Sequence, residues 1–267
     1  MRNLEFKYIL DKKLPIPTVW KKLASIIKSE IQTYSPYNVQ INGEFKEKDF
    51  VAIDKELSLS KNESHFSLTS ADFSYRHIFD YYLINREVRI RFPLDDLTQG
   101  SESLKNKLYQ NFSFSNMIYR QENEKSYFGK AFETEWYQPG KHNLFMMPAF
   151  YNERSFYIEG VTAEMWFGES FWQYASCSRE ELVACDWLET EEKDNGVLYV
   201  KAYHKEFDEA EGEQLAIQRR LLKLLFNIDE NRPHGGAPTE EKPKTFVQEI
   251  YIDDQTTIIG ELKEKKE

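Results

Sequence analysis

Thiol and imidazole side chains are the first groups in this sequence that could do chemistry, because a cysteine beside a histidine can act as a nucleophile and base pair. Cys177 would need His142 or His204 next to it, which only folding could bring about. Buried, inert thiols are the commoner outcome, so this pair stays an open alternative. The five histidines are scattered along the chain: His65, His77, His142, His204 and His234. No two of them have the i, i+4 spacing of a metal-binding helix, and the two cysteines lack zinc-knuckle spacing, so we expect no metal site.

A serine and two pairs of aspartates are the other candidates for catalysis. Gly168-Glu169-Ser170-Phe171-Trp172 has part of the nucleophile-elbow pattern of serine hydrolases, but it lacks the second glycine. Asp95-Asp96 and Asp253-Asp254 are adjacent carboxylates, and we interpret both pairs as turn formers. We therefore assign no catalytic residue and no cofactor. An enzyme for a small molecule, with a site built from dispersed His, Asp and Cys residues, is the alternative function.

The negative charge of the chain is concentrated in one segment. Residues 180–213 contain twelve acidic residues and three lysines, a local charge of −9 in a chain whose total is −10. Acidic residues 206–213 precede or open a predicted helix, whose N-terminus favours negative charge. Those before them have no such explanation, and they are the candidate partner-binding residues: Glu180, Glu181, Asp186, Glu189, Glu191, Glu192 and Asp194. Their mutual repulsion favours a basic partner, and the alternative is the solvated face of two helices.

The densest aromatic segment, residues 165–174, directly precedes the acidic one. Two interpretations are open for it: its aromatic side chains fill the core, or Trp166 and Trp172 anchor a protein partner beside the acidic residues. An apolar anchor next to a negative field is typical of a protein-binding surface for a basic partner. Nucleic acid is not an expected partner, because this segment would repel its phosphates.

Hydrophobic periodicity predicts the elements that position these residues. Alternation predicts strands at 4–10 and 87–92, and apolar residues three and four apart predict a helix from Thr18 to Ile31. Residues 74–84 fit either a helix or a strand. The other expected elements are a hairpin of strands Val39–Phe45 and Phe50–Leu59, a helix at Ser101–Asn111, strands at 144–147 and 155–158, a helix from Thr162 through Tyr174, a helix with a capping box at Ser178 and Glu181, a strand at Val197–His204, a helix from Asp208 to near Ile228, and a terminal hairpin of Phe246–Tyr251 with Thr256–Ile259.

Strands and helices are interspersed without regular βαβ alternation, so the expected fold class is α+β, with a mixed, mainly antiparallel sheet and several packed helices. The expected domains are an N-terminal α+β half at 1–95, a C-terminal α+β half at 96–228, a mobile loop at 229–245 and a terminal hairpin and tail at 246–267, or one domain that includes them all. The chain has no secretory apolar run and no stretch long enough to span a bilayer, so we expect a cytoplasmic protein without a membrane partner.

The segment from Ala163 to Gly168, continued through Phe171-Trp172 to Phe207-Asp208 and followed by an amphipathic helix, resembles bacterial immunity proteins, which neutralise partner toxins. The resemblance implies a cytoplasmic α+β protein that binds one toxin domain and blocks it, and it brings no catalytic residues. The leading hypothesis is therefore a non-enzymatic inhibitor that engages a basic toxin domain. A structural subunit of a larger assembly is a third hypothesis, and the sequence leaves the oligomeric state open.

Overall fold

The chain forms two compact units, Met1–Gly235 and Gly236–Glu267, each described here by itself. The computed structural model describes residues 3–31, 36–41, 44–60, 63–70, 77–83, 86–121, 157–158, 161–203, 213–227, 246–252 and 258–264. Among these residues, no helix is long and apolar enough to cross a membrane. The predicted loop at 229–245 and the predicted strand at 144–147 lie outside the described residues.

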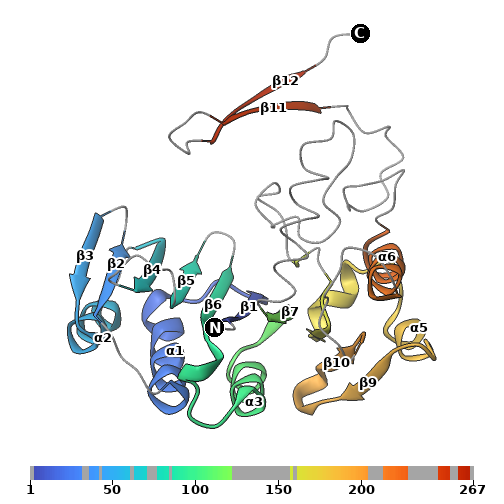
Figure 1. Ribbon diagram of the computed structural model, residues 1–267, viewed down its shortest axis with the longest axis horizontal. Coiled ribbons are helices and arrows are strands. Elements are labelled where there is room, and N and C mark those ends of the chain that lie inside the picture. The colour runs from blue at the N-terminus through green and yellow to red at the C-terminus, as the bar shows by residue number, and fades with distance from the viewer. Residues whose placement is uncertain are drawn as a thin grey trace. The chain divides into compact units, whose positions relative to one another are not determined.

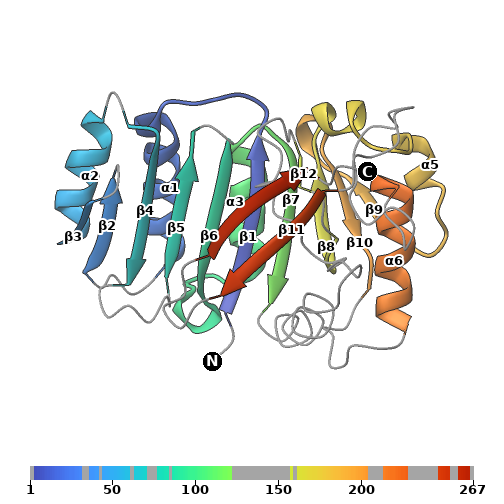
Figure 2. The same cartoon turned by 90° about the horizontal axis from the view of Figure 1, so that it is seen from above.

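A ten-stranded sheet is the centre of the first unit, with the strand order β3-β2-β4-β5-β6-β1-β7-β8-β10-β9. The strands are β1 (Asn3–Leu10), β2 (Tyr37–Ile41), β3 (Glu44–Lys48), β4 (His65–Ser70), β5 (Ile78–Tyr82), β6 (Glu87–Pro93), β7 (Phe114–Gln121), β8 (Glu164–Phe167), β9 (Glu189–Glu192) and β10 (Leu198–Lys201). Every pairing between these strands is antiparallel. Together with the helices, this sheet confirms the predicted α+β class (Figure 2).

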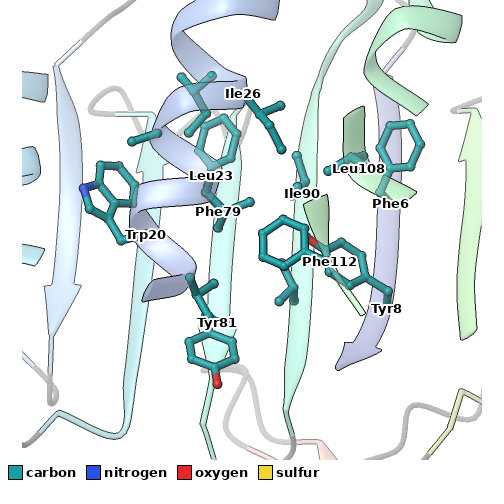
Figure 3. Close-up of a cluster of buried hydrophobic side chains, with 14 of the residues drawn as sticks. Phe6, Tyr8, Trp20, Leu23, Ile26, Phe79, Tyr81, Ile90, Leu108 and Phe112 are labelled. Carbon is teal, nitrogen blue, oxygen red and sulfur yellow. The ribbon is translucent and has the colours of Figure 1, made fainter. Parts of the chain in front are cut away.

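Three helices, α1 (Ile16–Glu30), α2 (Phe50–Leu59) and α3 (Ser101–Asn111), lie on one face of the sheet (Figure 1). The other helical elements are α5 (Arg179–Val183), α6 (Glu213–Phe226) and the short 3₁₀ turns η1 (Leu94–Asp96), η3 (Glu169–Gln173) and η4 (Asp194–Gly196). Alternate residues of the central strands face α1 and α3, because side chains of a strand point to opposite faces in turn. Phe6 and Tyr8 of β1 enter this first core with Trp20 of α1, whose side chain is fully buried (Figure 3).

A second core lies on the opposite face, at the β8–β10 end of the sheet. Met165 and Phe167 of β8 pack there with Phe171 of η3 and with Leu221, Leu222 and Leu225 of α6. Trp166, between them in sequence, points into the first core instead. β8 is therefore buried on both faces and holds the two cores together.

Several predicted elements are confirmed: the strands at β1 and β6, the helices α1 and α3, the capped helix α5 and the strand β10. The segment left open at 74–84 contains strand β5. The terminal hairpin is also confirmed, as β11 (Phe246–Ile252) paired with β12 (Ile258–Glu264) in the second unit. Helix α6 is confirmed from Glu213 onwards, and its predicted start at 208–212 lies outside the described residues.

Two predicted elements are wrong. Phe50–Leu59 is helix α2, because the Asp49 carboxylate accepts a hydrogen bond from the Ala52 amide (2.7 Å) and caps it. Ile53 and Leu57 are then buried one turn apart, and the predicted strand 39–45 divides into β2 and β3.

The second error is the helix predicted from Thr162 to Tyr174, which is strand β8 followed by η3. The segment is a strand because Met165 and Phe167 pack into one core and Trp166 packs into the other. Side chains that alternate between two faces have the two-residue period of a strand. The predicted boundary at residue 95 stays a prediction. It would separate β6 from β7, and both of these strands pair with β1.

Candidate protein-binding surface

The seven acidic residues singled out in the sequence lie on α5, on the following connection, on β9 and on η4, and β9 is the last strand at one end of the sheet. We call them the acidic edge: Glu180, Glu181, Asp186, Glu189, Glu191, Glu192 and Asp194. All seven are exposed. The fold thus gathers α5 and β9 at one end of the sheet (Figure 1). The seven side chains there face solvent.

A capping box holds α5 in place. The Ser178 hydroxyl accepts a hydrogen bond from the Glu181 amide (3.1 Å), and the Glu181 carboxylate accepts one from the Ser178 amide (2.7 Å). Leu182 is fully buried in the second core and fixes the helix against the sheet. The Glu181 side chain therefore stabilises α5. The described contacts show no such role for the side chain of its neighbour Glu180.

A tight turn joins β9 to β10. Asn195 and Gly196 have φ values of 64° and 74°, a left-handed conformation that asparagine and glycine adopt most readily. The Lys193 amide donates to the Val197 carbonyl (2.8 Å) and closes the turn. In the resulting register, Glu191 lies opposite Tyr199 and Glu192 opposite Leu198.

Segment 178–197 contains two cations, and each is already paired; a third, Lys201 of β10, lies opposite Glu189 in the register. Arg179 contacts Glu192 (3.2 Å) and donates to the Gly196 carbonyl (3.2 Å), and Lys193 contacts Glu191 (2.5 Å). Glu180, Asp186 and Asp194 make no ion pair with any residue that the structure describes. The edge therefore keeps a strong excess of negative charge. Part of it has a structural explanation, because charged side chains on an edge strand prevent pairing with other chains.

Neither tryptophan of the predicted anchor is exposed: one is buried and the other is half-buried. Trp166 is only 2% exposed and packs on the Tyr199 ring, with 5.1 Å between the ring centroids. Trp172 is half-buried against Phe167 and Phe171. The aromatic segment mainly builds the cores, which is the first of the two interpretations that the sequence left open.

Two other apolar side chains in this part of the chain are exposed. Tyr174, which follows η3, is 37% exposed, and Val183, the last residue of α5, is 44% exposed. Val183 was not among the surface residues predicted from the sequence. Helical periodicity carries the signal that could have found it, because Leu182 faces the core and its neighbour on a helix must point about 100° away.

Comparison with known proteins adds one result on the fold. No protein-family model matches the chain, and no curated protein matches it in sequence. A solved structure of a T6SS protein from Pseudomonas aeruginosa is similar, with a TM-score of 0.53 and 12% sequence identity. The similarity shows a shared fold. It covers 84% of this chain and 72% of the Pseudomonas protein.

Among the residues weighed for catalysis, the structure brings His77 and Asp96 into contact, while Cys177 lies in the second core. The Ser170 hydroxyl donates to the Asp11 carboxylate, and His77 contacts Asp96 (2.7 Å) and the Tyr37 hydroxyl (3.2 Å) in the first unit. His142, His204 and His234 lie outside the described residues. Within the described ranges, no group of three or more His, Cys, Asp or Glu residues is arranged to hold a metal ion.

The thiols are free, and burial disfavours their reactive form. Burial raises the pKa of Cys177 to about 11, and the nearby Glu181 carboxylate adds to the rise. The pKa of Cys185 is raised as well, again mainly by burial. Both groups therefore stay protonated at neutral pH, where a protonated thiol is a poor nucleophile.

Proposed function

We propose that this protein is a non-enzymatic protein-binding module, an immunity-type inhibitor that engages a basic toxin domain through its acidic edge. The observation that carries the proposal is the exposure of all seven carboxylates of the edge beside only two cations, Arg179 and Lys193, within 178–197. A basic protein surface is the partner that this charge pattern fits best.

Electrostatic attraction would act first on association. Glu189 and Glu191 are two residues apart on strand β9, about 7 Å, which is within the Debye length of about 8 Å at physiological salt, so their fields add. Clusters of this kind raise association rates with oppositely charged partners by about 10-fold or more. Tyr174 and Val183 offer the exposed apolar area that holds a complex after encounter, because binding energy concentrates in a few desolvated contacts.

Trp166 and Trp172 take a supporting role in this proposal. Trp166 packs on Tyr199, which lies opposite Glu191 in the sheet, so its ring sets the position of β10 and thereby of the edge strand β9. Trp172 packs on Phe171 behind the same end of the sheet. Both residues would shape the binding surface from inside.

The fold similarity to a T6SS protein is compatible with this role. We place the protein in the bacterial cytoplasm, with a basic domain of a secreted toxin as its partner. The direct test starts from the gene next to this one. If that gene encodes a secreted protein with a basic C-terminal domain, the domain is expressed in bacteria with and without this chain.

The proposal expects the domain to arrest growth alone and this chain to restore growth, with a stable complex of the two purified proteins. Growth arrest that this chain does not relieve, together with no complex by size-exclusion chromatography at low salt, would contradict it. A version of the domain that has lost its toxicity through a single substitution serves as the control for expression.

A further inference from the structure

The sheet face opposite α1 and α3 carries an unusual set of charged side chains. Phe6, Phe79 and Ile90 point into the first core, so their neighbours along β1, β5 and β6 point to the other face. These neighbours form what we call the carboxylate cluster, together with two cations: Glu5, Lys7, Asp80, Glu87 and Arg89. Four of them are more than nine-tenths buried, with exposures of 7% for Glu5, 5% for Lys7, 5% for Asp80 and 2% for Glu87.

Two ion pairs cross between β1 and β6 in this cluster. Lys7 contacts Glu87 at 3.1 Å, and the Arg89 guanidinium donates to Glu5 at 2.9 Å. Lys7 lies opposite Arg89 in the register, so both pairs run diagonally across the two strands. Buried ion pairs need hydrogen bonds for their remaining lone pairs, because desolvation of a charge is costly.

Two carboxylate oxygens lack such hydrogen bonds. The Oδ1 atom of Asp80 and the Oε2 atom of Glu87 are buried and have no hydrogen-bond partner among the described residues. In the register of β5 and β6, Asp80 lies opposite Arg89, and Tyr82 lies opposite Glu87. Asp80 and Glu87 are therefore diagonal neighbours on one face of two paired strands, a spacing that a long side chain such as glutamate can cross.

The environment of Asp80 already favours its neutral form. Burial raises the pKa of Asp80 to about 6, and the charges of Glu87 and Glu5 add to the rise. A hydrogen bond from Ser67 on β4 and the charge of Arg89 act in the other direction. Other titratable groups on this face, among the described side chains, include Arg91 of β6, Glu47 of β3 and the stacked rings of His65 and Tyr82, whose centroids lie 5.7 Å apart. Arg120 of β7 lies opposite Glu5 in the register.

We propose that Asp80 and Glu87 form a proton-sharing carboxyl pair that closes when the solution becomes mildly acidic. Asp80 takes one proton from solvent, and its new O–H donates to the Oε2 atom of Glu87. One hydrogen bond then involves both oxygens that lack a partner. The ion pairs of Lys7 with Glu87 and of Arg89 with Glu5 remain in place. The pair acts as a pH-dependent link between β5 and β6 at the centre of the sheet.

The sign of the effect follows from the raised pKa. Between the ordinary aspartate pKa and about 6, the folded state binds a proton at Asp80 that the unfolded chain does not. Stability from this group is therefore present below that window and is lost as the pH rises through about 6. The linkage relation gives about a tenfold change in the folding equilibrium constant between pH 7 and pH 5 for this one group.

A carbon-13 NMR titration of the side-chain carboxyls in the full chain tests the pair. The expected midpoint for Asp80 is about 6, with a second response of the Glu87 carboxyl at the same pH. Glu87→Gln should lower the Asp80 midpoint by about one unit, since it removes both a negative charge and the acceptor of a charge-assisted hydrogen bond. Asp54→Asn, on the helix side of the sheet, serves as the control and should leave the midpoint unchanged.

The stability measurement uses the same variants. Asp80→Asn should remove about a tenfold pH dependence of the folding equilibrium between pH 7 and pH 5, which wild type and Asp54→Asn keep. An Asp80 midpoint in the ordinary aspartate range would overturn the proposal. So would a midpoint that Glu87→Gln does not move, or a Glu87 carboxyl that is silent while Asp80 titrates. The wild-type titration decides the matter even if a variant fails to fold.

Discussion

Replacing Gly168 by alanine should destabilise the first unit strongly, because this residue packs directly on the backbone of β7. An added Cβ would lie 1.9 Å from the Phe114 carbonyl oxygen and 3.3 Å from that of Ser115. The Gly168 amide also donates to the Ser115 carbonyl at 2.6 Å, so the chain cannot move away without losing this bond. Overpacking costs about 1–3 kcal/mol, and a strained or lost hydrogen bond adds about 1 kcal/mol.

We expect Gly168→Ala to lower the free energy of unfolding by about 3 kcal/mol, measured by urea denaturation with tryptophan fluorescence. For a domain of this size the same loss lowers Tm by about 6–12 °C. Gly100→Ala is the matched control, because that glycine has a φ of 84° and no atom within 4 Å of an added Cβ. Its cost is backbone strain alone, about 1 kcal/mol. A Gly168→Ala protein that is as stable as wild type, or more stable than Gly100→Ala, would refute the packing argument.

Three further outcomes test other parts of the structure. Ser178→Ala should lower the free energy of unfolding by about 1 kcal/mol in urea denaturation, because it removes the cap of α5. Ser178→Thr should keep most of this stability. Lys105→Met should cost about 3 kcal/mol, because Lys105 is buried against Glu164 (2.8 Å) and its loss leaves that carboxylate without its cation; equal stability would show that the pair is dispensable. At pH 8, a thiol reagent should modify the half-buried Cys185 before the buried Cys177, whose pKa is about 11; faster labelling of Cys177 would contradict its burial.

The parts of the fold that the sequence predicts are those with an uninterrupted apolar period. Alternation in β1 and β6 and the capping box at Ser178 describe local contacts, and the structure has them as expected. Helix α2 was predicted as a strand, because its short apolar run fits either period and the deciding cap, Asp49, is a single polar residue.

The candidate surface could not be predicted from apolar periodicity. Strand β9 has the sequence Glu-Thr-Glu-Glu, with no apolar residue, and it becomes a strand only through its pairing with β10. Trp166 looked like a surface anchor because it adjoins the acidic residues, but the sheet places its ring in the first core. The carboxylate cluster could not be predicted from the sequence either. Strands β1, β5 and β6 come from separate segments of the chain, and only their register determines which charged side chains are neighbours.

The central claim is that the acidic edge binds a basic protein, and charge reversal at matched sites tests it most directly. Asp186→Lys with Asp194→Lys changes two edge residues that make no ion pair within the described part of the chain. Glu47→Lys with Asp95→Lys makes the same change in net charge at two exposed residues outside the edge, on β3 and η1. The measurement is the Kd for the basic toxin domain that this protein is proposed to bind, by calorimetry at low and high salt.

Each reversal replaces an attraction of about 0.5 kcal/mol by a similar repulsion, so the edge variant should weaken binding by about tenfold or more at low salt. The control variant should stay within about threefold of wild type, and added salt should weaken wild-type binding and narrow the difference between the two variants. Equal weakening by both variants, or a Kd that salt does not change, would contradict binding through the acidic edge.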